Sequence, residues 1–241
     1  MSSDTLVEVP DLASSGSEWI AAALLHFLET QERVYLGLSG GSTPKPVYTQ
    51  LGQRKDIPWE RVTLFLLDER FTDPESTDSN TRLVRETLLA PGSAAWDAVK
   101  EFLTPSCRAG ISVQESVQEY EERLRAVVES GGPHVCVYGL GPDGHFVSLF
   151  PPVPRNYLDT DALVLHTTTD VFAVRDRITV TFPFMTANRD AKNLFLLSGE
   201  EKKNVWVEME DASESSSEER WPVLKLLSFF SSSRVVALVA L

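Results

Sequence analysis

Short apolar runs and amphipathic segments alternate along this chain. Runs such as VTLFLL and HVCVY are apolar at almost every position, which is typical of strands buried on both faces of a sheet. In the segments between them, apolar residues recur every three or four positions, which predicts helices with one buried face. The predicted strands are 34–38, 62–70, 134–138, 162–166, 177–182, 193–198 and 234–241, and the predicted helices are 16–30, 44–51, 77–89, 111–130, 199–209 and 222–230.

This alternation of strands and helices predicts an α/β fold with a mostly parallel sheet flanked by helices. The chain shows no internal repeat and no obvious linker, so we expect one domain over residues 1–241. The segment EMEDASESSSEE (208–219) is acidic and rich in serine, and its composition predicts a mobile surface loop.

Composition and charge argue against several classes of partner and location. The net charge of −13 is unfavourable for binding nucleic acid or an anionic membrane surface. No apolar run reaches the ~20 residues of a spanning helix, and the acidic N-terminus does not have the pattern of a signal peptide. Two cysteines indicate no disulfide framework, so we expect a cytoplasmic protein, and we take a monomer as the simplest assembly.

Candidate chemistry gathers where three predicted strands end. Ligands of parallel sheets bind beyond the carboxyl ends of the strands, so these three ends are expected to form one site. The first is SGGSTP, where the backbone N–H groups of Gly40 and Gly41 and the hydroxyls of Ser42 and Thr43 could cradle a phosphate. An ordinary strand-to-helix turn explains the same residues equally well, because glycine-rich turns are common.

The second end is LLDER, in which Asp68, Glu69 and Arg70 follow a buried strand. Charge at this place often means only that the chain has reached solvent. The functional interpretation is an arginine that meets a phosphate or carboxylate, with its acidic neighbours fixing its orientation.

The third end is GLGPDGH, which closes on His145. Histidine is the side chain best suited to moving protons near neutral pH, and Asp143 is close enough to fix its tautomer. Gly141 and Gly144 permit the turn that would expose both side chains. A purely structural Asp–His pair remains the alternative, whereas His26, His134 and His166 lie in predicted helices or strands without a glycine setting.

These motifs together resemble one family. SGGSTP, DER, DSN (78–80), GLGPDGHFVSLFP, RITVTFP and SGEEKK occur in the order seen in 6-phosphogluconolactonases, from about Val34 to Trp206. The resemblance implies a three-layer Rossmann-like fold, as in the glucosamine-6-phosphate deaminase/ribose-5-phosphate isomerase superfamily. Deaminases of this superfamily carry a glutamate five residues after the motif histidine, where this chain has Phe150, and the lactonase branch is therefore favoured.

The resemblance also implies an activity and a set of roles. The family reaction is the hydrolysis of 6-phospho-D-glucono-1,5-lactone, a phosphosugar lactone, without a cofactor or metal. A glucosamine-6-phosphate deaminase or sugar-phosphate isomerase, and a non-catalytic sugar-phosphate sensor, are the alternatives. Whether Arg175 or Arg177 meets the substrate is left open, although Arg177 matches the motif. The implied catalytic residues are His145 as general base, Asp143 and Arg70, and the implied substrate- and phosphate-binding residues are Gly40, Gly41, Ser42, Thr43, Asp68, Gly144, Arg177 and Lys202.

Overall fold

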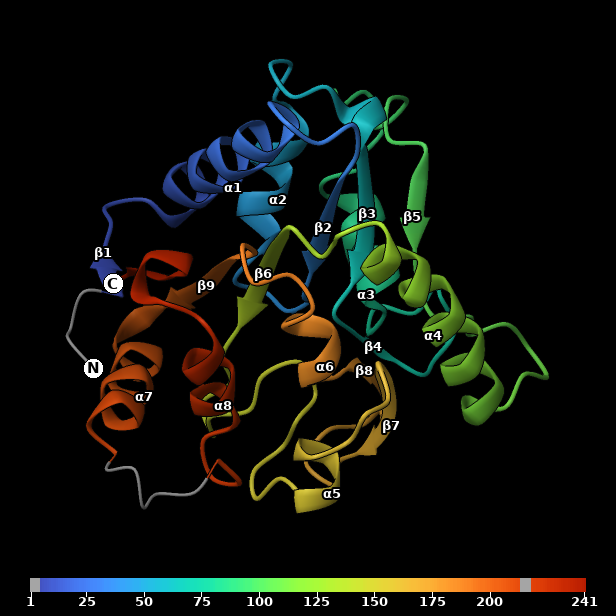
Figure 1. The fold of residues 1–241 in the computed structure, drawn as a ribbon, viewed down its shortest axis with the longest axis vertical. Helices are drawn as coiled ribbons and strands as arrows, with labels where there is room; N and C mark the ends of the chain where they lie inside the picture. Colours follow the sequence, from blue (N-terminus) through green and yellow to red (C-terminus); the bar gives the residue numbers. More distant parts are fainter. Residues whose placement is uncertain (1–4, 213–217) are drawn as a thin grey trace.

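A seven-stranded parallel sheet forms the centre of the structure, a computed structural model that describes residues 5–212 and 218–241. Each strand in it pairs in parallel with its neighbours (Figure 1). In the order in which they pair, the strands are β1 (Leu6–Glu8), β10 (Val235–Ala240), β9 (Lys192–Ser198), β6 (Val135–Gly139), β2 (Val34–Leu38), β3 (Val62–Leu66) and β5 (Glu101–Leu103).

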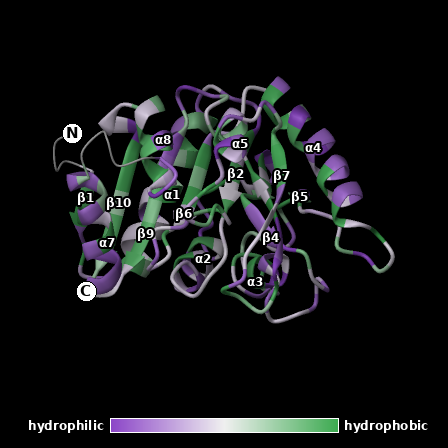
Figure 2. Ribbon diagram, turned by 90° about the horizontal axis from the view of Figure 1, so that it is seen from below, coloured by the Kyte–Doolittle hydropathy of each residue, from purple (hydrophilic) through white to green (hydrophobic). Residues whose placement is uncertain are grey.

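Helices cover both faces of this sheet and enclose two hydrophobic cores. Successive strand residues alternate between the cores, so that Leu36 packs on one face and Tyr35 on the other. Figure 2 shows β10, β9 and β6 as largely hydrophobic, which fits strands buried on both sides. The helices on one face are α1 (Leu12–Leu28), α2 (Lys45–Gly52) and α3 (Asn80–Glu86), and those on the other are α4 (Val113–Glu129), α6 (Phe182–Met185), α7 (Gly199–Asp211) and α8 (Pro222–Phe229). The predicted α/β fold with a mostly parallel sheet is confirmed.

Local sequence explains where the two longest helices begin. Asp11 precedes α1, and its carboxylate accepts hydrogen bonds from the backbone N–H groups of Ala13 and Ser14. Ser112 precedes α4 and forms a reciprocal capping box with Glu115. Such caps satisfy N–H groups that have no partner within the helix. In the described part of the chain, no helix has both the length and the apolar character needed to cross a membrane.

A second, three-stranded antiparallel sheet corrects the prediction of one strand over residues 62–70. The chain leaves the large sheet after Leu66, and β4 (Asp68–Arg70) pairs with β8 (Asp176–Val180), which pairs in turn with β7 (Val164–Thr168). Leu67 joins the sheets, because its N–H donates to the Leu38 carbonyl at the end of β2 and its carbonyl accepts from Val180 N–H, both at 2.9 Å. The apolar pattern continues through Leu67 and therefore gave no sign of the change of partner.

Other differences from the sequence prediction are small. The three-residue strands β1 and β5 were missed because each is too short to show a period. The short helical segments α5 (Arg155–Leu158), η1 (Trp59–Arg61) and η2 (Ser232–Arg234) were missed as well. In the predicted loop 208–219, residues 208–211 form the last turn of α7, where Met209 is buried in the core. Residues 213–217 lie outside the described residues, and both the mobility of this loop and the single domain remain predictions.

His134 is a buried histidine that packs between the sheet and α1. Its ring stacks on Tyr35 and meets Phe27 edge-on, with centroids 5.7 and 5.0 Å away. The Nδ1 atom accepts a hydrogen bond from the Tyr35 N–H at 3.2 Å, which requires that nitrogen to be unprotonated. Burial lowers the pKa of His134 to about 4, and the ring is neutral in the folded protein above that pH.

We predict that His134 makes the protein less stable as the pH falls. The unfolded chain takes up a proton near the ordinary histidine pKa of 6.5 and the folded chain only near 4, so stability is lost between these values. The loss attributable to His134 is at most about 3 kcal/mol. Urea unfolding of wild type and of His134→Gln, whose amide oxygen can accept the same bond without titrating, should diverge in this pH window. Parallel curves for the two proteins would contradict the assignment.

Candidate active site

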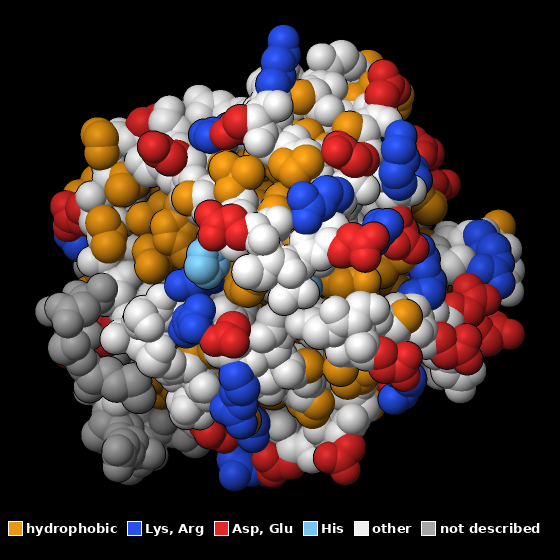
Figure 3. Space-filling model, turned by 45° about the horizontal axis from the view of Figure 1, so that its top comes forward, with side chains coloured by type: hydrophobic (Ala, Val, Ile, Leu, Met, Phe, Trp, Pro, Cys, Tyr) orange, Lys and Arg blue, Asp and Glu red, His pale blue; other side chains and the backbone are white. Residues whose placement is uncertain are grey.

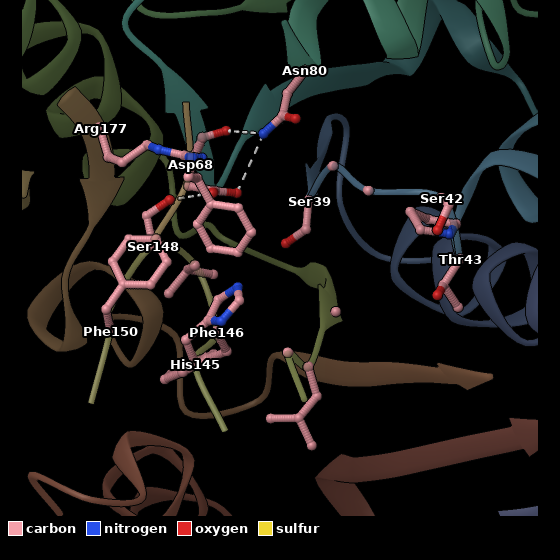
Figure 4. A pocket seen from close by; sticks show the side chains of 18 of the residues that line it. Ser39, Ser42, Thr43, Asp68, Asn80, His145, Phe146, Ser148, Phe150 and Arg177 are labelled. Atoms are coloured by element: carbon pink, nitrogen blue, oxygen red, sulfur yellow. Dashed lines mark hydrogen bonds between the residues drawn. The ribbon is translucent and has the colours of Figure 1, made fainter. Parts of the chain in front are cut away.

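The carboxyl ends of β9, β6, β2 and β3 meet at one edge of the large sheet, and residues that follow these strands line a cavity of about 240 Å³. The SGGSTP turn follows β2, the GLGPDGH turn follows β6, and β4 continues from β3. The predicted convergence of three strand ends is therefore found in the structure (Figure 4). Of the predicted residues, those that line the cavity are Gly40, Gly41, Ser42, Thr43, Asp68, Arg70, His145, Arg177 and Lys202, whereas Asp143 and Gly144 do not line it.

The glycine turn is shaped by close packing and by one special backbone angle. Gly41 has a φ of +101°, a conformation that favours glycine. A Cβ on Gly40 would lie 1.8 Å from Oδ1 of Asn80, so only glycine lets α3 approach this closely. The Tyr48 hydroxyl donates to the Ser39 carbonyl at 2.9 Å and ties the turn to α2.

Lys202 reaches the glycine turn from α7, as the sequence motif implies. Its Nζ donates to Oγ1 of Thr43 at 3.0 Å, and Thr43 also bonds Ser198 at the end of β9. Lys203 instead pairs with Glu8 outside the cavity. Burial lowers the pKa of Lys202, against a smaller opposing effect of Glu201. Only the first lysine of SGEEKK therefore belongs to the site.

Glu69 is an internal anchor and does not line the cavity. Its carboxylate is buried and accepts hydrogen bonds from the backbone N–H groups of Arg70, Asn80 and Thr81 and from the hydroxyls of Ser79 and Thr81. Burial raises the pKa of Glu69, and these hydrogen bonds act against the rise. The carboxylate thereby fixes the start of α3 to β4, between the two residues that face the site.

Asp68 is held from two sides. The Ser148 hydroxyl donates to Oδ2 of Asp68 at 2.6 Å, and Nδ2 of Asn80 donates to the Asp68 carbonyl at 2.8 Å (Figure 4). Ser148 and the preceding Val147 both have positive φ values, 57° and 41°. Hydroxyls of the small sheet hold this strained backbone, with Thr167 donating to the Ser148 carbonyl. Strain of this kind at a cavity wall is typical of functional sites.

Arg70 and Arg177 face each other across the small sheet. They are direct partners in the β4–β8 register, an arrangement of like charges that is unfavourable without an anion nearby. Arg177 is buried, and its Nε donates to the Val174 carbonyl at 3.0 Å. Burial and the charge of Arg70 lower the pKa of Arg177, although a guanidinium stays charged near neutral pH.

Two phenylalanines complete the wall around Arg177 and His145. The rings of Phe150 and Phe172 lie 5.7 and 5.5 Å from the Arg177 guanidinium carbon, within the range of cation–π attraction. The same rings lie 4.8 and 5.7 Å from the His145 ring. Arg175 points elsewhere and pairs with Asp170 at the surface. Of the two candidate arginines, the structure places Arg177 at the cavity.

His145 bonds Asp143 through one imidazole nitrogen, and its other nitrogen has no hydrogen-bond partner among residues 5–212 and 218–241. Its Nδ1 is hydrogen-bonded to Oδ1 of Asp143, which fixes the orientation of the imidazole. Partial burial acts to raise the pKa of Asp143, but the hydrogen bonds and charge of His145 outweigh it and lower that pKa. A Cβ on Gly141 would lie 2.2 Å from the imidazole, so this glycine is required for the pair to form.

Gly144 supports this turn from outside the cavity. Its φ of +83° favours glycine, and a Cβ there would lie 2.6 Å from the Trp221 ring. Arg220 stacks on that ring and donates to the Asp143 carbonyl at 2.8 Å. Gly144 does not line the cavity, so the cavity does not support the contact with substrate that the resemblance implies. Its positive φ and its packing against Trp221 instead shape the turn.

The lining residues that the sequence analysis did not name as site residues include Ser39, Asn80, Ser148 and Phe172. The first three belong to motifs that were quoted, SGGSTP, DSN and SLFP, so their motif membership was the available signal. Phe172 lies in an unremarked loop and could be placed only by the fold.

The charge of the cavity differs from that of the surface. Figure 3 shows acidic and basic side chains interspersed over one face, with acidic ones numerous on the side where Figure 1 places α4. The cavity lining instead carries Arg70, Arg177 and Lys202 against the single carboxylate of Asp68. Surface charges are screened over ~8 Å at physiological ionic strength, so the lining dominates locally. Within residues 5–212 and 218–241, no three His, Cys, Asp or Glu side chains gather as a metal site would require.

Comparison with known proteins gives a consistent result. The family model of glucosamine-6-phosphate isomerases/6-phosphogluconolactonase matches residues 8–229. A protein of Dictyostelium discoideum named "Probable 6-phosphogluconolactonase" is 39% identical over 202 residues, covering 80% of this chain and 79% of its own. A 6-phosphogluconolactonase of Thermotoga maritima is 31% identical over 192 residues, covering 80% and 81%. The crystal structure of a 6-phosphogluconolactonase from Shewanella baltica superposes with a TM-score of 0.83 at 25% identity, covering 98% and 97%.

We predict that the cavity binds sulfate and that binding weakens as the pH rises. Lys202 carries its charge at neutral pH and loses it at a lower pH than an ordinary lysine, because burial lowers its pKa. Sulfate keeps a constant charge, so calorimetric titration from about pH 7 to pH 10 reports on the protein alone. Lys202→Arg, which stays charged throughout, should retain its affinity at high pH. Identical pH profiles for wild type and Lys202→Arg would remove Lys202 from the anion site.

Proposed function

The chain belongs to the glucosamine-6-phosphate isomerase/6-phosphogluconolactonase family, and we propose that it is a 6-phosphogluconolactonase. The reaction is hydrolysis of 6-phospho-D-glucono-1,5-lactone to 6-phospho-D-gluconate, the second step of the oxidative pentose phosphate pathway. The observation that carries the proposal is the Asp143–His145 pair at a cavity lined by three cationic side chains. A proton-transfer group beside an anion-binding wall suits a substrate with both a phosphate and an ester.

Phe150 supports the lactonase over a deaminase. Deaminases of the superfamily resemble one another in having a glutamate at this position as part of a relay with the histidine. Here the Phe150 ring packs 4.8 Å from the His145 ring and offers no proton-accepting group. The one carboxylate hydrogen-bonded to His145 comes, within the described residues, from Asp143. This arrangement fits a single proton-transfer centre.

His145 acts as the general base in the proposed mechanism. Because Nδ1 is engaged by Asp143, Nε2 is the nitrogen that takes a proton from water as the water oxygen attacks the lactone carbonyl. The imidazolium that forms is stabilised by the Asp143 carboxylate. It then returns the proton to the ring oxygen as the ester bond breaks, which leaves a free hydroxyl and a carboxylic acid. The acid ionises to the carboxylate by releasing the second proton of the water to solvent. Such proton transfer typically contributes ~10²–10⁴-fold to the rate.

Arg70 is suited to stabilise the negative charge on the tetrahedral intermediate. One of its terminal nitrogens is occupied by the Asp78 carbonyl, while its Nε has no partner among the described residues. Backbone N–H groups of the Gly40–Gly41 turn are the alternative donors. The Ser148 hydroxyl holds the Asp68 carboxylate in place. The negative charge of Asp68 offsets part of the repulsion between the Arg70 and Arg177 guanidinium groups.

The phosphate is held at the other end of the cavity in this proposal. Gly40, Gly41, Ser42 and Thr43 supply backbone and hydroxyl donors, and Lys202 supplies charge next to Thr43. Figure 4 shows Arg177 across the cavity from Ser42 and Thr43, so it adds its charge from the opposite wall. Anchoring the phosphate positions the reactive carbonyl against His145. The groups invoked in this mechanism all belong to one chain. We therefore also propose that the reaction needs neither a metal nor a cofactor. We propose further that residues 1–241 form one domain and that the protein acts as a monomer.

The decisive assay generates the lactone in situ from glucose 6-phosphate and follows 6-phosphogluconate. We expect the protein to accelerate its formation above the spontaneous rate of hydrolysis. Ammonia release from glucosamine 6-phosphate should stay at background. Acceleration of the second reaction in place of the first would assign the chain to the deaminase branch. If neither reaction is accelerated, a non-catalytic sugar-phosphate sensor is the remaining alternative.

Two histidines with the same kind of partner provide a matched test of the base. His145→Ala should lower kcat/KM by ~10²–10⁴-fold, because the proton acceptor is lost. His166→Ala removes a histidine whose Nε2 is 2.7 Å from Oδ1 of Asp176 but which does not line the cavity, and it should retain wild-type activity. Equal activity of wild type and His145→Ala would refute the assigned base, provided that circular dichroism shows both to be folded.

A further inference from the structure

Unpartnered polar atoms concentrate at the cavity. Five buried side-chain atoms of the described residues lack any hydrogen-bond partner, and they are Ser39 Oγ, Arg70 Nε, Asn80 Oδ1, Ser116 Oγ and Trp206 Nε1. The first three belong to residues that line the cavity. A buried polar group without a partner destabilises the folded state, so such groups are rare and call for an explanation.

Ser39 is the clearest of the three because the rest of the residue is fully satisfied. Its N–H donates to the Val137 carbonyl at 3.1 Å, and its carbonyl accepts from Tyr48. The residue is 5% exposed, and its hydroxyl points into the cavity in Figure 4, on the side of His145 and Asp68. Among the described residues, no side chain or backbone group forms a hydrogen bond with this hydroxyl.

The position of Ser39 indicates which part of a ligand it meets. The cationic groups lie on either side of it, with Lys202 at the Thr43 end and Arg177 across the cavity beside Asp68. In the proposed function the phosphate lies at the Thr43 end beside Lys202, and Ser39 faces the space between that end and His145, where the uncharged carbon chain would lie. In a sugar acid that chain carries hydroxyl groups, which both donate and accept hydrogen bonds, as the serine hydroxyl does.

We propose that Ser39 is a specificity-determining residue that hydrogen-bonds a hydroxyl of the sugar portion of the substrate. Asn80 Oδ1, an unpartnered acceptor, and Arg70 Nε, an unpartnered donor, border the same cavity and extend its capacity for polar contacts. The cavity thereby selects phosphates that carry a polyol chain over phosphates that do not. This inference rests on the proposed function for the identity of the sugar acid.

The first test compares a sugar-acid phosphate with inorganic phosphate, which lacks the hydroxylated carbon chain and the carboxylate. Calorimetry on wild type and Ser39→Ala would measure Kd for 6-phosphogluconate and for inorganic phosphate, which has no carbon chain. Ser39→Ala should bind 6-phosphogluconate about 3- to 10-fold more weakly, the usual result of losing one neutral hydrogen bond, and phosphate as tightly as wild type. Equal loss for both ligands, or loss for neither, would overturn the proposal.

Singly deoxygenated 6-phosphogluconates identify the hydroxyl. For the one that Ser39 binds, removal should weaken binding to wild type but cause no further loss in Ser39→Ala. Additive losses for every analogue would also overturn the proposal. Ser39→Cys, which keeps the side-chain size but bonds weakly, should show the pattern of Ser39→Ala and guards against an effect of the altered volume.

Ser116 offers a matched control for the structural effect. Its hydroxyl is likewise buried and unpartnered, but it lies in α4, away from the cavity. Both Ser39→Ala and Ser116→Ala should leave the Tm unchanged or raised, because each removes an unsatisfied group. Only Ser39→Ala should alter sugar-acid binding. Failure of wild type to bind 6-phosphogluconate at all would refute the proposed function, whereas normal binding by Ser39→Ala would refute this inference alone.

Discussion

The parallel pairing of β6, β2 and β3 is the constraint on which the site depends. Because these neighbouring strands run in the same direction, their carboxyl ends lie together, and the turns that follow them must share one edge of the sheet. Burial on both faces fixes the register, since a slip of one residue would send Leu36 and Tyr35 into the wrong cores. The energy that holds the site together is thus mostly the burial of apolar strand residues far from any chemistry.

The small antiparallel sheet adds what the large sheet alone could not provide. The hydrogen bonds of Leu67 to both sheets turn the chain after β3, and β4 then places Arg70 beside Arg177. Two adjacent guanidinium groups are unfavourable for folding, but they give the cavity a positively charged wall, and the proposed function uses this wall to bind an anion. Glu69 offsets part of this cost by tying β4 to the start of α3 through several hydrogen bonds.

Surroundings, and not residue type, distinguish the two histidine–aspartate pairs of this protein. The Nε2 atom of His166 lies 2.7 Å from Oδ1 of Asp176 on the small sheet, and neither residue lines the active-site cavity. His145 bonds Asp143 through Nδ1 in place of Nε2, and it lies in a glycine turn that lines a cationic cavity, with two phenylalanine rings beside it. A proton acceptor becomes catalytic where a bound ligand can reach it, and the glycines around His145 make that access possible.

The sequence by itself determined the α/β architecture, the two-sided burial of the strands and the three motifs that carry Gly40, Arg70 and His145, because apolar periodicity and glycine-rich turns are local properties. It did not reveal that β4 leaves the large sheet, since the apolar run continues through Leu67 and partner choice depends on residues more than a hundred positions away. The motif resemblance named Lys202 and favoured Arg177, but only the packing shows why these two side chains, and not Lys203 or Arg175, reach the cavity. Lys202 and Lys203 are neighbours of the same type, and helix direction alone sends one to Thr43 and the other to Glu8.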